Sequence, residues 1–487
     1  MREPKTITIE PITRLEGHGK IVIFLDEDGN VENAYFQIPE LRGFERFCEG
    51  RKAEDMPQIT SRICGVCPPA HHFASTKALD AAFDVDPPPA AKKLRELTYN
   101  GYIFYDHTLH FYFLGAPDFI VGPDAQPSER NILGVIRQVG LDIANEVIKH
   151  RAYGQKIIEM MCGKATHPVC GLPGGVSKAL TEEERKEIEK MMESGVEFAK
   201  FSLKLFDDVV LKSKKYVDLI LNDAYSLKTY YMGLVDENNK VNFYDGEVRV
   251  VDPEGREFVK FIPSNYLDII EERVEEWTYV KLPYLKKVGW AGLVDGPASG
   301  VYRVGPLGRL NASEGMATPL AQQEYERMYE TLGGKPVHST LAFHWARLIE
   351  LLYAAERALD LSRDEEITSK DIRNKPGTPG EGIGIIEAAR GTLIHHYELD
   401  EEGLVKKVNL IVATTNNNPA ICMSIRDAAK ALIHGNKVSE GLLNMVEMAF
   451  RAYDPCLACA THFAVGQMPL EIKIYDHNKK LLKTLRR

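Results

Sequence analysis

The sequence predicts an α+β fold, a predominantly helical bundle with small antiparallel sheets at its periphery. Short β-rich runs occupy residues 5–38, and apolar residues recur at spacings of three and four across residues 129–162 and 181–221. Such spacings place apolar side chains on one face of a helix. Residues 228–312 combine Gly, Pro, Asp and aromatic residues with short β-rich runs, which predicts irregular structure and small sheets.

The strands at the amino terminus are predicted from alternation and turn chemistry. Residues 6–9 alternate in character, residues 20–24 are β-rich, and Asp28-Gly29 lies between two such runs. An Asp-Gly pair favours a tight hairpin turn. We therefore expect antiparallel strands in this part of the chain.

Helices are expected from about residue 85 onward. Pro87-Pro88-Pro89 stops the preceding element, and Thr181, followed directly by three glutamates, is a typical helix N-cap. Further helices are predicted at residues 315–333, 340–363 and 424–452, and a strand at residues 406–412. No repeat or clean linker interrupts the chain, which favours one interwoven unit whose termini meet.

Composition excludes several classes of protein. Of the 487 residues, 44% are hydrophobic and 27% charged, a balance typical of a globular protein. The net charge of −10 argues against a general nucleic-acid binder. No run of 18 apolar residues and no apolar leader are found, so we expect a cytoplasmic protein without a transmembrane helix. Eight cysteines are too few for a disulfide scaffold of this length.

Two CxxC pairs carry the most distinctive chemistry. Cys64 and Cys67 lie near one end of the chain, and Cys456 and Cys459 lie near the other. Thiolates are soft ligands that suit zinc, nickel, copper or iron–sulfur clusters. Spacing alone leaves a structural zinc site or a redox dithiol open. A metal that ties both ends of a large chain together is better explained if the metal itself is functional.

The motifs around these cysteines resemble those of [NiFe]-hydrogenase large subunits. RICGVCPPAHH at residues 62–72 is similar to RxCGxCxxxH, and DPCLACATH at residues 454–462 is similar to DPCxxCxxH. Four further segments fit in order: TRLEGH at 13–18, RGFE at 42–45, PGGV at 173–176 and EAARG at 387–391. The sequence around these motifs is most similar to the group of methyl-viologen-reducing hydrogenases that are linked to heterodisulfide reductase.

The resemblance implies the large-subunit fold and a particular domain organisation. Residues 1–462 would form a single interwoven domain, and residues 463–487 a maturation extension. In the family an endopeptidase cuts after the histidine that corresponds to His462. The alternative is that the extension is permanent, as in some unprocessed relatives.

The resemblance also implies the metals and their ligands. Nickel would be held by the four cysteines of the two pairs, and Cys67 and Cys459 would bridge to an iron that carries carbon monoxide and cyanide. A second ion, magnesium or iron, would lie near the carboxy terminus. Glu45 and His462 match its ligands.

The implied chemistry is the reversible heterolytic cleavage of dihydrogen. Cys456 matches the thiolate that first accepts the proton, and Glu16 matches the carboxylate that relays it outward. Arg390 matches an arginine above the metals, where it can polarise hydrogen and donate to a cyanide, and Asp454 would pair with it.

Two more polar residues match positions around the metals. Thr414 occupies the place of a hydroxyl near the other cyanide. His71 occupies the place of a histidine near a bridging sulfur.

The implied partners follow from the absence of a ferredoxin-type cysteine motif. Electrons would leave through an iron–sulfur small subunit, then through further electron-transfer subunits, either heterodisulfide-reductase-like or a flavoprotein. Two alternatives to the enzyme are a hydrogen sensor with the same site and a quinone-binding relative in respiratory complex I. The complex I relative lacks the four cysteines, which disfavours that interpretation.

Overall fold

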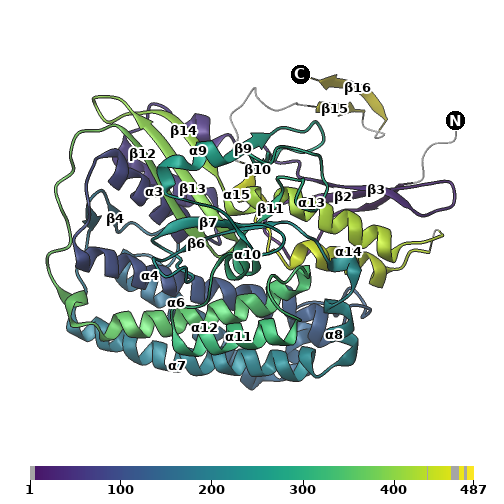
Figure 1. The fold of residues 1–487 in the computed structure, drawn as a ribbon, viewed down its shortest axis with the longest axis horizontal. Coiled ribbons are helices and arrows are strands. Elements are labelled where there is room, and N and C mark those ends of the chain that lie inside the picture. The colour runs from purple at the N-terminus through teal and green to yellow at the C-terminus, as the bar shows by residue number, and fades with distance from the viewer. Residues whose placement is uncertain (1–5, 436, 462–470, 477–479, 487) are drawn as a thin grey trace.

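Four long helices form the body of the molecule in this computed structural model, which describes residues 6–435, 437–461, 471–476 and 480–486. They are α4 (Pro89–Leu109), α6 (Leu141–Cys162), α7 (Glu182–Phe206) and α12 (Phe343–Arg363). α12 packs against both α4 and α7, and α4 also packs against α6 (Figure 1). α12 is buried along nearly its whole length, because other helices pack against it on several sides.

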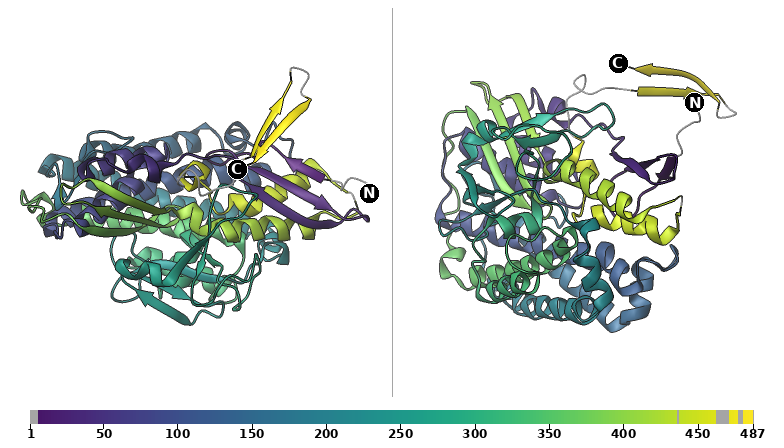
Figure 2. Two further views of the ribbon diagram at one scale, coloured as in Figure 1. Left: turned by 90° about the horizontal axis from the view of Figure 1, so that it is seen from above. Right: turned by 45° about the vertical axis from the view of Figure 1, so that its right-hand side comes forward.

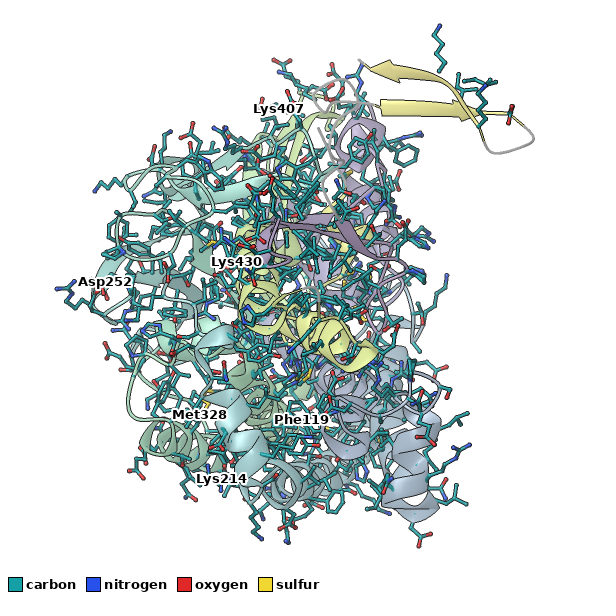
Figure 3. The ribbon with its side chains drawn as sticks, turned by 90° about the vertical axis from the view of Figure 1, so that its right-hand side faces the viewer. Phe119, Lys214, Asp252, Met328, Lys407 and Lys430 are labelled. Carbon is teal, nitrogen blue, oxygen red and sulfur yellow. A yellow bond between two sulfur atoms is a disulfide. The ribbon has the colours of Figure 1, made fainter. Side chains whose placement is uncertain are left out.

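The helix boundaries follow local chemistry where the sequence is explicit. Thr181 caps α7, because its hydroxyl accepts from the backbone N–H of Glu184 while the Glu184 carboxylate accepts from the backbone N–H of Thr181. The predicted cap is therefore confirmed. Charged side chains such as Lys214 and Lys407 lie at the periphery, whereas Phe119 and Met328 lie between elements (Figure 3).

Small sheets lie around this body, as predicted (Figures 1 and 2). The amino-terminal sheet is antiparallel, in the order β1-β2-β3, and a second antiparallel sheet, β12-β13-β14, packs on α3. A four-stranded sheet has the order β11-β6-β7-β8, with β11 parallel to β6. The strands are β1 (Thr6–Ile9), β2 (Lys20–Leu25), β3 (Val31–Gln37), β4 (Gly171–Leu172), β5 (Gly175–Val176), β6 (Tyr230–Val235), β7 (Glu247–Val251), β8 (Glu257–Phe261), β9 (Ile270–Arg273), β10 (Leu282–Leu285), β11 (Tyr302–Arg303), β12 (Glu381–Ala388), β13 (Gly391–Leu399) and β14 (Val405–Ile411).

Shorter helices connect these layers and carry the chain past the cysteine pairs. They are α1 (Phe44–Cys48), α2 (Met56–Thr60), η2 (Ser61–Ile63), α3 (Pro68–Ala82), α5 (Ile132–Val139), α8 (Lys214–Ile220), α9 (Tyr266–Ile269), α10 (Gly305–Ala312), α11 (Pro319–Thr331), α13 (Ala413–Leu432), α14 (Glu440–Arg451) and α15 (Leu457–Ala460). None of the helices in the described part of the chain combines the length and apolar character that a membrane crossing needs.

The helix predicted at residues 424–452 is wrong in its bounds. Two helices, α13 and α14, occupy this region, and α13 begins already at Ala413. Three asparagines followed by Pro419 disfavour a helix locally, yet Pro419 lies inside α13. Tertiary bonds explain the difference: the Asn416 side chain donates to the Thr392 carbonyl oxygen, and the Asn417 side chain accepts from the Val304 N–H.

The segments that carry Glu16 and Leu457, near opposite ends of the chain, meet as expected. The Leu457 N–H donates to the Glu16 carbonyl oxygen at 2.8 Å, and Phe36 stacks on Phe450. A hairpin of β15 (Glu471–Tyr475) and β16 (Leu481–Arg486) lies outside the main body (Figures 1 and 2). The fold therefore brings both CxxC segments to one place, while the β15–β16 hairpin lies apart from them.

Candidate metal centre

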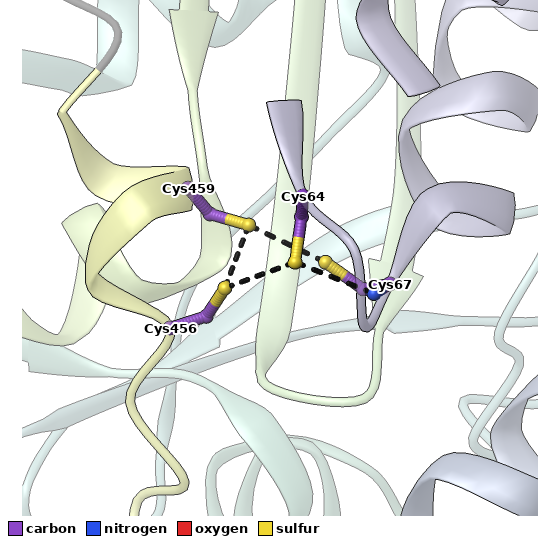
Figure 4. A group of neighbouring side chains, drawn as sticks. All are labelled: Cys64, Cys67, Cys456 and Cys459. Atoms are coloured by element: carbon purple, nitrogen blue, oxygen red, sulfur yellow. Dashed lines mark hydrogen bonds between the residues drawn. The ribbon is translucent and has the colours of Figure 1, made fainter. Parts of the chain in front are cut away.

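Four cysteine sulfurs converge in the interior. Cys64 follows η2, Cys67 precedes α3, Cys456 precedes α15, and Cys459 lies within α15 (Figure 4). The Sγ–Sγ distances are 3.3 Å from Cys64 to Cys456, 3.4 Å from Cys67 to Cys459 and 2.8 Å from Cys456 to Cys459. All four sulfurs lie within 4.8 Å of one another, and all four residues are buried. The predicted meeting of the two distant pairs is therefore confirmed.

The cluster needs a cation to ionise fully. Hydrogen bonds from Cys456 and Cys459 hold the pKa of Cys64 well below its usual range, whereas burial raises the pKa of both Cys456 and Cys459 well above theirs. One thiolate is thus stabilised at the expense of the others, because like charges repel at these distances. A soft divalent metal removes this conflict, and the donor set fits one.

Glu16 lies against this cluster. Its Oε2 accepts from Cys456 Sγ at 3.0 Å and from the Ala458 N–H at 3.0 Å. Burial, followed by the Cys64 charge, raises the pKa of Glu16. Gly17 permits this close approach, because a Cβ there would lie 2.8 Å from both Ala458 N and Leu457 Cβ.

Arg390 is the second charged residue near the sulfurs. Its guanidinium donates to both carboxylate oxygens of Asp106, at 3.1 Å each, and to Asp454 at 3.2 Å. The guanidinium charge interacts electrostatically with the cluster, since the thiolates of Cys456 and Cys67 help to raise the pKa of Arg390. Burial raises the pKa of Asp454 to about 7 despite the neighbouring Arg390.

Comparison with known proteins identifies the family. A sequence profile described as "Nickel-dependent hydrogenase" matches residues 42–130 and 234–462, and one described as "HoxL-like" matches residues 6–41. This chain belongs to the nickel-dependent hydrogenases. The resemblance inferred from the motifs is confirmed, and with it an oxidoreductase that acts on hydrogen.

Individual relatives cover this hydrogenase almost completely. An F420-non-reducing hydrogenase iron-sulfur subunit from Archaeoglobus profundus is 50% identical over 99% of both chains. The beta chain of the NAD-reducing hydrogenase HoxS from Cupriavidus necator is 37% identical, covering 98% of this chain and 99% of that one. The crystal structure of an NAD+-reducing [NiFe]-hydrogenase in the H2-reduced state has a TM-score of 0.89 at 38% identity, over 94% of this chain and 99% of that chain. The predicted large-subunit fold is confirmed.

The remaining predicted site residues of this hydrogenase have the following contacts, except for His462, which the structure does not describe. The Thr414 hydroxyl accepts from the Cys456 N–H at 3.0 Å. His71 Nδ1 lies 3.2 Å from His395 Nε2, and Glu45 Oε1 accepts from the Leu410 N–H at 2.9 Å. His462 lies outside the described residues, so the second metal site stays a prediction.

The sequence analysis did not predict the residues that hold Arg390 and the backbone before it in place. Asp106 binds Arg390 directly, and Arg309 donates to the Ala388 carbonyl oxygen at 2.8 Å, just before Arg390 in the chain. Arg309 is itself held by Glu350 at 2.5 Å and Glu387 at 2.7 Å. The short spacing of acidic and basic residues in YDHTLH at 105–110 was the one available signal for Asp106.

Proposed function

We propose that this chain is the large, catalytic subunit of a [NiFe]-hydrogenase and cleaves dihydrogen heterolytically and reversibly. The observation that carries the proposal is the buried set of four sulfurs with the Glu16 carboxylate and the Arg390 guanidinium close to it. Cys64, Cys67, Cys456 and Cys459 would hold the nickel, and Cys67 and Cys459 would also hold the iron. When bound, this metal pair supplies a place for the two electrons of hydrogen.

Cys456 and Glu16 handle the proton. A proton on Cys456 Sγ is already within hydrogen-bond distance, 3.0 Å, of Glu16 Oε2. A raised pKa suits Glu16 to the task, since a carboxylate with an ordinary pKa would accept a proton less readily. Glu16 also lines a surface hollow together with His18, Glu40 and Arg62, which gives the proton a way out of the interior.

Arg390 and Thr414 fit the diatomic ligands that we propose on the iron. Arg390 Nε is buried and has no acceptor among the described residues, so its hydrogen is available for a cyanide. Thr414 Oγ1 accepts from the Cys456 N–H, which leaves its own hydrogen for a second cyanide. Asp106 and Asp454 keep the Arg390 guanidinium in place. His71 would position a bridging sulfur.

We also propose a magnesium or iron ion held by Glu45 and His462. Glu45 is 6% exposed, and a buried carboxylate of this kind is a ready ligand for a hard cation. Residues 1–462 would form one domain, and a maturation endopeptidase would remove residues 463–487. The position of the β15–β16 hairpin outside the body agrees with its removal.

Electrons would leave through another polypeptide. Within the described residues the four cysteines are the one cluster of three or more metal-binding side chains, so no onward iron–sulfur relay is found there. An iron–sulfur small subunit is the expected partner, with further electron-transfer subunits of the heterodisulfide-reductase or flavoprotein type. The relatives are named for F420-non-reducing and NAD-reducing hydrogenases, which favours an enzyme over the hydrogen sensor. We expect it in the cytoplasm.

Elemental analysis combined with infrared spectroscopy tests the proposal. Active protein should contain one nickel and at least one iron per chain and show bands of metal-bound carbon monoxide and cyanide. A zinc-only protein without these bands would refute it. Mass spectrometry of the same sample tests the cleavage: the active chain should end at His462.

A further inference from the structure

Two cysteines outside the metal cluster, Cys162 and Cys170, form a disulfide. Cys162 is the last residue of α6, and Cys170 directly precedes β4, so the bond closes a ring around a short loop. Both cysteines are buried, whereas Lys164 in the loop is exposed. The two other cysteines outside the cluster, Cys48 and Cys422, are buried and free.

The loop inside this ring contacts the segment that leads to the first metal-binding pair. His167 adopts a left-handed backbone with a φ of 56°, and its Nδ1–H donates to the Ser61 carbonyl oxygen at 3.1 Å. Ser61 begins η2, which ends directly before Cys64. A loop closed by a disulfide therefore holds the chain three residues before a predicted metal ligand.

The residue that follows the ring contacts the chain after the same pair, and His72 connects this contact to the chain before the pair. The N–H of Gly171, the residue after Cys170, donates to His72 Nε2 at 2.8 Å. Because Nε2 accepts, the neutral ring carries its proton on Nδ1, which donates to the Pro57 carbonyl oxygen at 3.1 Å. Burial lowers the pKa of His72 to about 4, which keeps the ring neutral.

We propose that the Cys162–Cys170 disulfide is a redox-responsive clip that positions residues 57–72, the segment that carries Cys64 and Cys67. Its bonds to Ser61 and His72 fix this segment at two points, one before and one after the CxxC pair. The clip therefore couples a thiol–disulfide equilibrium to one half of the metal site.

The switching step is a thiol–disulfide exchange with a dithiol protein. Local opening at the exposed residues 163–164 first uncovers a sulfur. A thiolate of that protein then attacks it, the bond between Cys162 and Cys170 breaks, and a mixed disulfide forms. The second thiol of the protein then resolves it. The protein leaves as a disulfide, and this chain gains two electrons and two protons as two thiols. Opening the ring gives residues 163–169 more conformations, which weakens the hold on Ser61.

Peptide mapping tests whether the bond exists. The holoenzyme is unfolded in the presence of N-ethylmaleimide without reductant and digested with trypsin, which cuts the ring at Lys164. We expect peptides 157–164 and 165–178 to remain linked, lighter by two hydrogens than their sum, and to separate after treatment with a dithiol. Two maleimide-labelled peptides in place of the linked pair would overturn the proposal.

Hydrogen exchange tests the positioning. Reduction of the holoenzyme with a dithiol should accelerate amide exchange in residues 57–66 about threefold or more, and so should the Cys162→Ala/Cys170→Ala variant. His167→Ala keeps the disulfide but removes the bond to Ser61, so it should accelerate exchange at the same amides without altering the linked peptides. Lys164→Arg, which keeps the trypsin site, and Cys422→Ala are the matched controls and should change neither readout.

The same exchange measurements also define the result that would contradict the proposal. If reduction and His167→Ala both leave exchange in residues 57–66 unchanged, the disulfide is a local staple and the positioning role is wrong. Neither readout depends on turnover, so a failure of the hydrogenase proposal would be seen separately.

Discussion

Glu16 Oε2 lies 3.0 Å from Cys456 Sγ, although 440 residues separate them in the chain. The contact is held by the backbone, since Glu16 bridges to Cys456 in parallel fashion and the Leu457 N–H donates to the Glu16 carbonyl oxygen. A carboxylate fixed in this way can take a proton from the thiol without a rearrangement. The two ends of the chain together supply both groups of the proposed proton path, which neither end contains alone.

Replacing Glu16 tests this path. Glu16→Gln keeps the shape and the bond from the Ala458 N–H but cannot accept a proton, so hydrogen oxidation should fall by about 10²-fold or more. Nickel content should stay unchanged. Dye reduction under hydrogen measures the rate. Glu27→Gln, at an exposed turn, is the control; an active Glu16→Gln enzyme would rule out the path.

We expect the contribution of Arg390 to activity to depend on the forked geometry of its guanidinium as well as on its charge. Arg390→Lys keeps the charge but cannot bind both oxygens of Asp106 while reaching Asp454, so kcat should fall by about 10²-fold with a normal unfolding temperature. The exposed Arg363→Lys is the matched control. Equal activity in Arg390→Lys would show that charge alone suffices.

Removal of one metal ligand should abolish loading. Cys67→Ser replaces a soft thiolate with a hard, weakly acidic hydroxyl, so nickel per chain should drop to background in elemental analysis. Cys422→Ser changes a buried free cysteine elsewhere in the core and should retain the metal. Nickel at the normal level in Cys67→Ser would contradict the assignment of this ligand.

Arg309 should be essential for stability. It lies between Glu350 and Glu387, and all three side chains are fully buried. Arg309→Met leaves two buried carboxylates without their cation, which should lower the free energy of unfolding by about 3–5 kcal/mol. Denaturant unfolding measures this. The exposed pair of Arg363 and Glu189 provides the contrast, since Arg363→Met should cost less than about 1 kcal/mol.

His72 should make the fold acid-sensitive. Its pKa is lowered by burial from 6.5 to about 4, so between these values the unfolded chain binds a proton that the folded chain does not. As far as His72 is concerned, the free energy of unfolding therefore has its full value above pH 6.5. It decreases as the pH falls toward 4, by up to about 1.4 kcal/mol per pH unit. His72→Gln should flatten this part of the unfolding profile. An unchanged slope would mean that another group controls it.

The sequence by itself determined the family, through its motifs, and much of the architecture. Two CxxC motifs with their flanking residues predicted a set of thiolate ligands, and periodicity and the Thr181 cap specified helices such as α7, because these features depend on neighbours within a few residues. Cys456 could be matched to Glu16 only through the family resemblance, not from any local pattern.

Only the tertiary structure decided which distant groups support the site. Asp106 under Arg390, Arg309 under the turn before it, and the pairing of Cys162 with Cys170 depend on how separate helices and sheets pack. The same holds for the start of α13, where side-chain bonds from neighbouring elements outweigh the local preference against a helix. Buried charges and polar groups need hydrogen-bond or ion-pair partners, and the fold supplies these from segments that are far apart in the sequence. The spacing of residues along the chain does not show which segments these are.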